Sequence, residues 1–230
     1  MPTSRVYLLG GEDILKRTMK DTDKQAISEA GENPVVLVFP WTSESEKKKY
    51  RKVEVDYFKD LGARKVIFGE LTDSLQRLRE KINTSNMVYL PGGDTDLLFN
   101  RLRNSGVSLL LKKYMGVLVG NSAGSLVLCK RYVIIKGQDA SPVTKVFEGI
   151  GVVDFAVAVH YKSGNSGDSG EEPDKSLRAL SRKFKTIIYA IPENGALIFD
   201  KETLRFVGEI FSFKNGKKRK CQNHLNSQWI

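Results

Sequence analysis

Residues that build disulfide frameworks and metal centres are scarce in this sequence. The 230 residues include two cysteines, Cys129 and Cys221, and two histidines, His160 and His224. One pair of cysteines does not form a disulfide framework, and two widely separated histidines lack the spacing of metal ligands. The sequence therefore predicts no metal site and no cofactor, and it indicates that Cys129 is a packing residue.

Long hydrophobic runs are absent as well. No apolar stretch reaches the ~20 residues that span a bilayer, and the apolar part of Met1–Gly10 is too short for a secretory signal. No linker rich in proline or serine and no internal repeat divides the chain. We therefore expect a cytoplasmic protein without a membrane partner, with one domain over residues 1–230 and a basic polar tail from about residue 214.

Acidic residues are outnumbered by basic ones. The chain has 37 Lys and Arg against 27 Asp and Glu, a formal net charge of +10, with basic clusters at Lys47–Lys52 and Lys217–Lys220. Such clusters can bind nucleic acid or an acidic surface. However, the first lies on an expected helix that also carries glutamates, the second lies in the expected tail, and aromatic residues are not interleaved with either. We therefore expect no nucleic-acid partner.

Apolar segments rich in strand-forming residues alternate with segments long enough for helices. This alternation is typical of parallel strands joined by crossover helices, and three closely spaced later segments indicate an antiparallel edge. The sequence therefore predicts an α/β fold. The expected strands are Val6–Leu9, Val35–Phe39, Lys65–Phe68, Met87–Leu90 and Val117–Val119, then Ala196–Asp200, Thr203–Val207 and Ile210–Phe213. The expected helices are Thr22–Ala30, Glu46–Leu61, Ser74–Ile82 and Leu97–Tyr114, the last broken near Gly106.

One turn between an apolar run and a helical segment has the pattern of a nucleophile elbow. The residues Gly120-Asn121-Ser122-Ala123-Gly124 follow Tyr114–Val119 and precede Ser125–Cys129. In such an elbow the positions two before and two after the nucleophile must be nearly free of side chain, and the next amide can donate to an oxyanion. The pattern predicts Ser122 as a nucleophile and Ala123 as an oxyanion donor. The alternative is that Ser122 only caps a helix.

A serine nucleophile needs a base, which is usually a histidine. His160 ends the strand-like run Val152–Val159, whereas His224 lies in the polar tail. A base is expected at a strand end, so we predict that His160 serves Ser122. The alternative is a structural histidine whose hydrogen bonds are satisfied within the fold.

The group that orients the histidine is expected at a strand end on the same edge of the sheet. The run Ile187–Ile191 leads directly to Glu193, which we predict for this role. Asp139, which lies between the elbow and His160, is the competitor. Glu193 has an alternative explanation as a turn residue before Asn194-Gly195, because this pair favours tight connections.

A second strand end that carries glycines is Pro91–Thr95. The amide of Gly92 or Gly93 can complete an oxyanion hole, with Gly93 preferred, and the lysine and spacing of a P-loop are missing. Asp94 or Thr95 can also cap the following helix, and both interpretations can hold together. Ligands of open α/β sheets bind outside the carboxyl ends of strands. The residues expected to bind substrate are Gly92, Asp94, Thr95, Asn121, Tyr161 and Lys162.

Four motifs together resemble peptidase family S51, whose members include the aspartyl dipeptidase peptidase E and, more distantly, cyanophycinase. The similarity runs from about Arg5 to about Phe213 and depends on the order and spacing of the motifs. They are Pro-Gly-Gly-Asp-Thr at 91–95, Gly-Asn-Ser-Ala-Gly at 120–124, Val-His-Tyr at 159–161 and Ile-Pro-Glu-Asn-Gly at 191–195.

The resemblance implies a three-layer αβα sandwich related to class I glutamine amidotransferases, with a mostly parallel central sheet and an antiparallel C-terminal edge. It implies Ser122 as nucleophile, His160 as base and Glu193 as orienting acid. Asp139 falls near an aspartate that has also been proposed for that last role. The implied substrates are short peptides, and a homodimer is left open.

The polar, glycine-rich segment Lys162–Asp174 follows the expected base and is either a mobile lid or a plain surface loop. The peptidase E subgroup carries an arginine in this region, whereas this sequence has Glu171, Glu172 and Asp174. Carboxylates facing an aspartyl substrate would repel it. The departure therefore argues against an aspartyl preference.

The leading hypothesis is a serine peptidase that hydrolyses short peptides, in the manner of a dipeptidase, through a Ser-His-Glu triad and an acyl-enzyme. A related amide or isopeptide hydrolase resembling cyanophycinase is the first alternative. The second is a ligand-binding protein that has the fold without catalysis.

Overall fold

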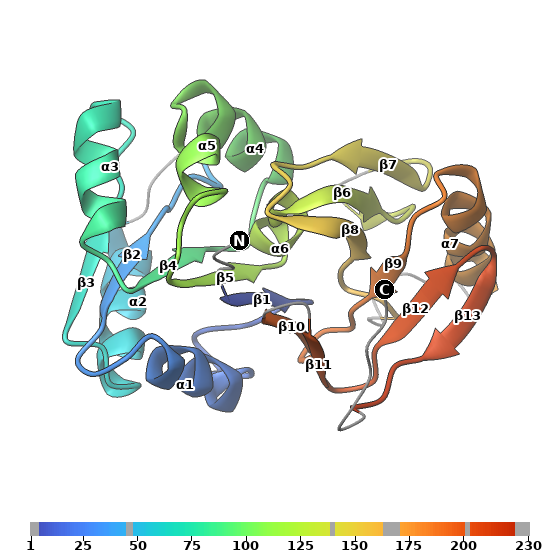
Figure 1. Cartoon of the computed structure of the whole chain (residues 1–230), viewed down its shortest axis with the longest axis horizontal. Helices are drawn as coiled ribbons and strands as arrows, with labels where there is room; N and C mark the ends of the chain where they lie inside the picture. Colours follow the sequence, from blue (N-terminus) through green and yellow to red (C-terminus); the bar gives the residue numbers. More distant parts are fainter. Residues whose placement is uncertain (1–4, 45–47, 139–140, 163–170, 201–202, 224–230) are drawn as a thin grey trace.

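The structure is a computed structural model that describes residues 5–44, 48–138, 141–162, 171–200 and 203–223. Two sheets lie side by side along the long axis of the molecule (Figure 1). No helix in these described ranges is long and apolar enough to cross a membrane. The first sheet has seven strands in the order β11-β10-β1-β5-β4-β2-β3, and the second has six in the order β13-β12-β9-β8-β6-β7.

The first sheet has a parallel centre and an antiparallel edge. Parallel pairs join β1, β5, β4, β2 and β3, whereas β10 pairs antiparallel with both β1 and β11. The bounds are β1 (Arg5–Leu9), β2 (Val35–Val38), β3 (Lys65–Phe68), β4 (Met87–Leu90), β5 (Val117–Asn121), β10 (Ala196–Asp200) and β11 (Thr203–Val207). These bounds agree with the strands expected from the sequence to within two residues.

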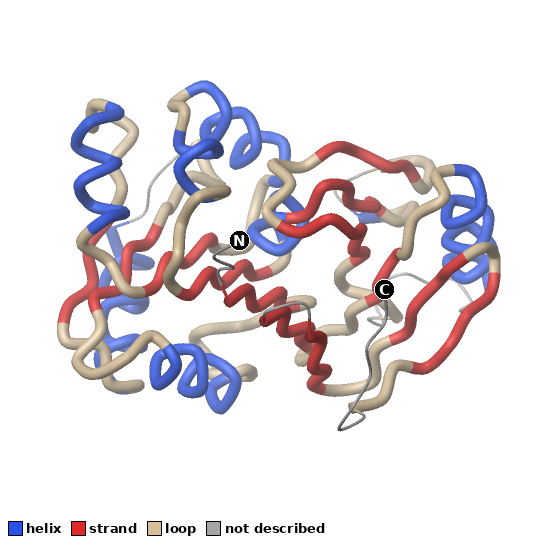
Figure 2. Tube along the Cα trace, in the orientation of Figure 1, coloured by secondary structure: helices blue, strands red, loops and turns tan. Residues whose placement is uncertain are grey.

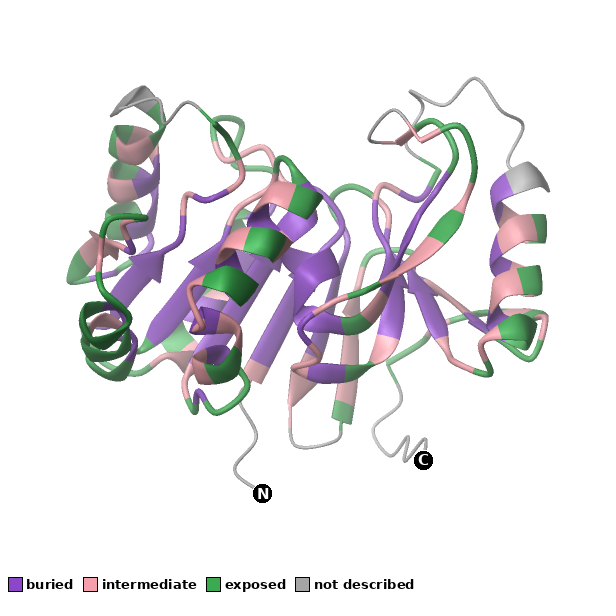
Figure 3. Ribbon diagram, turned by 90° about the horizontal axis from the view of Figure 1, so that it is seen from above, coloured by how far each residue is buried: buried purple, intermediate pink, exposed green. Residues whose placement is uncertain are grey.

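Helices cover both faces of this sheet because its strands are apolar on both sides. In β1, Tyr7 packs with Ile27 and Phe58 on one face, and Leu8 packs with Leu98 on the other. Figure 3 shows the buried residues in the strands and on the inner sides of the helices. This confirms the three-layer αβα architecture. The helices are α1 (Lys20–Glu29) and α2 (Lys48–Asp60) on the first face, and α3 (Leu75–Asn83), α4 (Thr95–Asn104) and α5 (Val107–Leu111) on the second.

A separate second sheet was not expected from the sequence, although three of its strands correspond to the expected strand Ile210–Phe213 and to the strand-like runs Val152–Val159 and Ile187–Ile191. The expectation that Ile210–Phe213 belongs to the antiparallel edge of the first sheet is therefore wrong.

The centre of the second sheet is parallel, since β8 pairs in parallel with β6 and β9, and β7 and β12 flank it antiparallel. Helix α7 (Glu171–Lys183) contributes Leu177 to the apolar cluster on one face of it. Figure 2 shows this helix in blue beside the strands of the second sheet. Its strands are β6 (Cys129–Ile134), β7 (Lys145–Glu148), β8 (Val153–Ala158), β9 (Ile188–Ala190), β12 (Phe211–Lys214) and β13 (Lys217–Lys220).

Three local expectations are wrong. Helix α6 (Ala123–Leu128) ends before Cys129, which is the first residue of β6. The basic segment Lys217–Lys220 is not a tail but β13, joined to β12 by a turn at Asn215-Gly216, both with positive φ. Residues 163–170 of the expected loop lie outside the described residues, and the loop ends at 171 because α7 begins there.

The turn from β5 into α6 depends on two close backbone contacts. A Cβ on Gly120 would lie 2.5 Å from the backbone of Gly124 and Ser125, and a Cβ on Gly124 would lie 2.0 Å from the carbonyl oxygen of Leu90. Both distances are too short for any side chain. The glycines therefore let α6 turn back directly onto β4 and β5.

We expect Gly124→Ala to lower the free energy of unfolding by at least about 2 kcal/mol, because the added methyl group overlaps a main-chain oxygen that cannot move aside. Urea unfolding followed by circular dichroism measures this change. Gly92→Ala is the control, since its Cβ would meet neighbours at ordinary distances of 3.4 Å or more. Equal stability of the two variants would contradict the prediction.

Candidate active site

The carboxyl ends of β1, β5, β8 and β9 converge at the junction of the two sheets. The amide of Ser122 donates to the carbonyl of Leu9 (3.1 Å), and the amide of His160 donates to the carbonyl of Gly10 (3.0 Å). The amide of Asn194 donates to the carbonyl of Gly11 (3.2 Å). The segment after β1 therefore holds all three loops through its own main chain.

The side chains of Ser122, His160 and Glu193 form a hydrogen-bonded chain. The Oγ of Ser122 lies 2.7 Å from Nε2 of His160, and Nδ1 of His160 lies 3.1 Å from Oε1 of Glu193. A carboxylate beside Nδ1 favours the tautomer that carries its proton there, which leaves Nε2 to accept from the serine hydroxyl. The geometry matches a nucleophile, base and orienting acid.

Residues of this site, like several turn residues elsewhere in the described chain, have a positive φ. Ser122 has φ 49° and ψ −106°, a conformation that residues with side chains seldom adopt. His160 has φ 50° and Asn194, next to Glu193, has φ 60°. Such conformations cost ~1–3 kcal/mol each and occur mainly at functional sites. The strain at Ser122 is what a nucleophile elbow imposes.

Glycine is needed at positions 10 and 11 because the loops after β8 and β9 lie directly against the main chain of these two residues. A Cβ on Gly11 would lie 2.6 Å from Cε1 of His160 and 3.1 Å from Cγ of Glu193. A Cβ on Gly10 would lie 2.1 Å from the carbonyl oxygen of Pro192. The imidazole therefore lies directly against the backbone of Gly11.

Two amides are candidates for an oxyanion hole. Ala123 is the first residue of α6, and the first amides of a helix have no acceptor within it. The glycines after β4 lie beside the nucleophile, since a Cβ on Gly92 would lie 3.4 Å from Cβ of Ser122. Thr42 fixes this loop, because its hydroxyl donates to the carbonyl of Gly92 (2.8 Å) and its carbonyl accepts from the amide of Asp94 (3.0 Å).

Ser122 and His160 open into a cavity of about 920 Å³ on the α2 side of the first sheet. Asn121 lines it, and its side-chain amide both accepts from and donates to the main chain of Glu12. The other lining residues come from the segments after β1, β2 and β4 and from α2. They are Gly11–Leu15, Pro40, Thr42, Ser43, Tyr50, Arg51, Val53, Glu54, Tyr89 and Pro91–Gly93.

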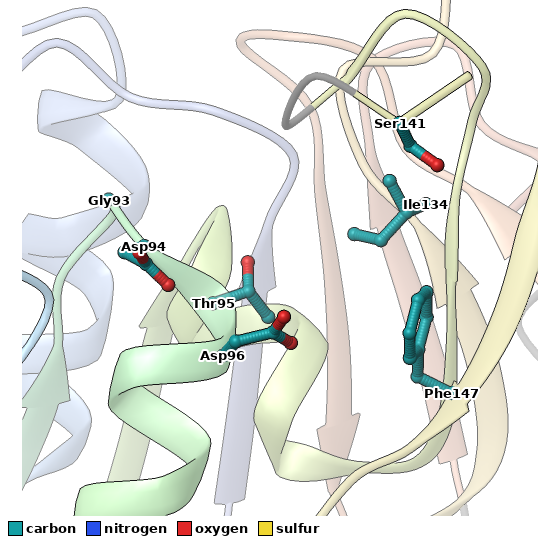
Figure 4. A pocket seen from close by; sticks show the side chains of 7 residues that line it. All are labelled: Gly93, Asp94, Thr95, Asp96, Ile134, Ser141 and Phe147. Carbon is teal, nitrogen blue, oxygen red and sulfur yellow. The ribbon is translucent and has the colours of Figure 1, made fainter. Parts of the chain in front are cut away.

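A second cavity of about 440 Å³ adjoins the first at Gly93. In Figure 4 the start of α4 faces residues of β6, β7 and the loop between them. Asp94 caps α4, since its Oδ1 accepts from the amide of Leu97 (2.8 Å), so the capping interpretation is confirmed. The lining residues are Gly93, Asp94, Thr95, Asp96, Ile134, Ser141 and Phe147.

Two residues expected at the substrate site point elsewhere. Tyr161 is buried among the strands of the second sheet, where its hydroxyl donates to Asp174 and accepts from Nζ of Lys218 (2.8 Å). Lys162 is exposed and lies 5.3 Å from the ring of Phe211. Neither residue is among those that line the cavity. Both predictions of substrate contact therefore lack support in this geometry.

Two further acidic residues that the sequence analysis considered, Asp139 and Asp174, are not among the described residues of the candidate site. Asp139, the competitor for the orienting acid, lies outside the described residues. Asp174 was expected to face the substrate, but its carboxylate is paired with Lys218 (2.7 Å) in the second sheet. The described residues contain no group of three or more side chains able to hold a metal ion.

The sequence analysis missed Gly11, Glu12 and Glu54, all of which line the cavity. A signal existed for the first two, because Gly10-Gly11 directly follows the apolar strand β1, as Gly92-Gly93 follows β4. Glu54 had no such signal. It lies in a charged helix, and only the packing of α2 on the sheet makes it 8% exposed and turns it toward the cavity.

A strained serine at the end of a central parallel strand, hydrogen-bonded to a histidine, is the arrangement found in serine hydrolases of several α/β folds. The family model for peptidase family S51 matches residues 6–207. The chain therefore belongs to peptidase family S51.

Among curated proteins, an uncharacterized peptidase of Pasteurella multocida is 28% identical over 39% of this chain and 46% of its own length. A second, from Listeria monocytogenes, is 24% identical over 40% of this chain and 48% of its own length. The alignments thus span about half of each curated relative.

Solved structures share the fold over most of the chain. A peptidase from an acI-B1 Actinobacterium superimposes with a TM-score of 0.75 at 19% identity, covering 95% of this chain and 94% of its own. A candidate peptidase E protein from Listeria monocytogenes EGD-e gives a TM-score of 0.65 at 17% identity, covering 89% of this chain and 98% of its own.

We expect Asp174→Asn to destabilise the protein by about 1 kcal/mol at pH 7. Burial alone would raise the pKa of Asp174, but hydrogen bonds from Lys218 and Tyr161 outweigh it and lower the pKa. The folded state therefore gains stability from the ionised carboxylate above the ordinary pKa of an aspartate, and loses it as the pH falls through the lowered value.

The difference in unfolding free energy between wild type and Asp174→Asn should thus shrink as the pH falls through the lowered pKa of Asp174, which urea titrations at several pH values measure. Glu209→Gln is the matched control, because Glu209 pairs with Lys220 on the same sheet but both side chains are more than half exposed. A difference in unfolding free energy between wild type and Asp174→Asn that stays the same in acid would contradict the prediction.

Proposed function

We propose that this protein is a serine peptidase that hydrolyses short peptides through Ser122, His160 and Glu193. The observation that carries the proposal is the unbroken hydrogen-bonded chain from the Ser122 hydroxyl through His160 to Glu193, with the hydroxyl held on a strained elbow at the mouth of a cavity. Membership of peptidase family S51 supports it.

In the proposed reaction, Oγ of Ser122 attacks the carbonyl carbon of the scissile amide while Nε2 of His160 takes its proton. The imidazolium then gives this proton to the leaving amine, which leaves an acyl-enzyme. Water attacks the acyl-enzyme with His160 again as the base, and the acid product and free serine are released. Glu193 holds the ring and stabilises its positive charge.

The tetrahedral intermediate carries a negative oxygen that must be stabilised as it forms. The amide of Ala123 at the start of α6 and the amide of Gly93 in the loop held by Thr42 are the proposed donors. Both belong to rigid main chain, so little reorganisation is needed when the charge develops.

The size of the cavity favours a small substrate. Its volume of about 920 Å³ is at the upper end of the range for pockets that hold small ligands, which fits a peptide of a few residues. A related amide or isopeptide hydrolase would use the same chemistry on another bond. A ligand-binding protein would have the cavity but no turnover.

We expect Ser122→Ala to lower kcat for a hydrolysed short peptide by roughly 10³-fold or more, because no acyl-enzyme can form. A library of dipeptides and short peptides, assayed with wild type and variant in parallel, measures this. A serine-directed phosphonate that labels only Ser122 in the wild type is the companion measurement. Equal hydrolysis by both proteins, or labelling elsewhere, would refute a serine peptidase.

We expect Glu193→Gln to lower kcat by about 10²- to 10⁴-fold, because the amide does not stabilise the imidazolium and can favour the wrong tautomer. Asp139→Asn should retain nearly full activity if Glu193 is the orienting acid. The two matched variants are compared by kcat at saturating peptide, with thermal unfolding as a check of folding. The reverse ranking would assign the role to Asp139.

A further inference from the structure

The cavity beside Ser122 is acidic at the end formed by the segment after β1 and by α2. Glu12 and Glu54 line this end, and the side chain of Glu54 is almost completely buried. Burying a carboxylate in a cavity wall is costly unless a compensating charge or hydrogen bond is available. The groups that surround Glu12, at the end of the cavity nearer the nucleophile, therefore decide which ligand this end can accept.

Asn121, the residue before Ser122, holds the main chain of Glu12 close to the nucleophile. The amide of Glu12 donates to Oδ1 of Asn121 (2.8 Å), and Nδ2 of Asn121 donates to the carbonyl of Glu12 (3.2 Å). Because Asn121 is the residue immediately before Ser122, this pair of bonds fixes Glu12 relative to the elbow.

The carboxylate of Glu12 has neutral partners among the described residues. Tyr57 donates its hydroxyl to Oε1 (2.8 Å), and Tyr89 donates to Oε2 at a longer distance of 3.4 Å. Tyrosine hydroxyls solvate a carboxylate but do not cancel its charge. Glu12 therefore lines the cavity with hydrogen-bond donors but no cation at its carboxylate among the described residues.

Asp23 lies behind Glu12 and is fully buried. Its Oδ2 accepts from Tyr57 (2.6 Å), while its Oδ1 meets no hydrogen-bond donor in the described part of the chain. Burial, followed by the charge of Glu12 and a hydrogen bond with it, raises the pKa of Asp23 well above its usual range. Asp23 therefore supplies no positive charge to Glu12.

Two other charged residues of the wall, Arg51 and Asp13, face partners. Both terminal nitrogens of Arg51 donate to the carboxylate of Glu70, at 2.9 and 2.6 Å. Asp13 is paired with Lys16 (3.2 Å). No ion pair to Glu12 is present among the described residues, so a ligand is the available source of a positive charge for it.

We propose that the acidic end of this cavity, centred on Glu12 with Glu54 in the same wall, binds a positively charged nitrogen group of the substrate. The group is an ammonium or guanidinium ion, carried either on a basic side chain or on a free amino terminus. This inference rests on the proposed peptidase function, and it adds the substrate class. An acidic side chain would be repelled from the same position.

The first experiment compares wild-type kinetics on peptide pairs that differ only in charge. The pairs are lysine against norleucine, arginine against citrulline, and a free against an acetylated amino terminus. We expect the charged member of at least one pair to have kcat/KM higher by about 10- to 100-fold, since a charge-assisted contact is strong in a partly buried site. The pair that responds identifies which cation is bound.

The second experiment measures whether the preference depends on the acidic wall. Glu12→Gln and Glu54→Gln should each reduce the charged-to-neutral ratio to within about threefold of unity, and because the ratio is taken within each variant, any loss of activity common to both peptides cancels. Asp56→Asn is the matched control, because Asp56 is exposed on the same helix as Glu54 and does not line the cavity. It should keep the wild-type ratio.

A binding measurement separates this inference from the proposed chemistry. Ser122→Ala is titrated by calorimetry with the amides of arginine and citrulline and with lysine- and norleucine-containing dipeptides. Tighter binding of the charged ligands, lost on adding Glu12→Gln, would support the cation site even if no peptide is hydrolysed. Equal affinity within each pair, tighter binding of an aspartyl peptide, or a preference that survives both glutamate substitutions would overturn it.

Discussion

The contact on which the site depends is the approach of Gly10-Gly11 to the loops that follow β8 and β9. The main chain of these glycines accepts hydrogen bonds from the amides of His160 and Asn194, and no side chain at Gly11 could coexist with the imidazole. This contact joins the first sheet, which carries Ser122, to the second, which carries the other two residues of the candidate triad. Without it the three side chains would belong to separate parts of the molecule.

Charged groups in the two sheets have different roles. At the second sheet, Asp174 of α7 and Lys218 of β13 neutralise one another beside the buried Tyr161, so they stabilise the region that follows His160. After β1 of the first sheet, Glu12 lines the cavity and has no ion pair among the described residues. The sequence argued against an aspartyl preference because of Asp174, but Asp174 does not line the cavity. Under the proposed cation site, the residue that would repel an aspartyl side chain is Glu12.

Much of the first sheet was predictable because local patterns and the final fold agree there. The strands are short apolar runs, the helices between them are amphipathic, and Gly106 separates α4 from α5 as expected. The second sheet was not predictable in the same way, since its edge strand β13 consists of Lys217–Lys220. Those residues form a strand because the turn at Asn215-Gly216 pairs them with β12, and Lys218 packs over the ring of Phe211 (4.2 Å). The Asn-Gly pair was the signal that went unused.

The sequence by itself determined the elbow at Ser122, the α/β class and the family resemblance, because these depend on residues that are close together or in fixed order. Only the tertiary structure decided that His160 and Glu193 meet Ser122, and that Glu12 faces the same cavity. Side chains far apart in sequence meet only when the backbone brings their strand ends together. Here Gly10 and Gly11 allow that approach, and local sequence patterns carry no information about such distances.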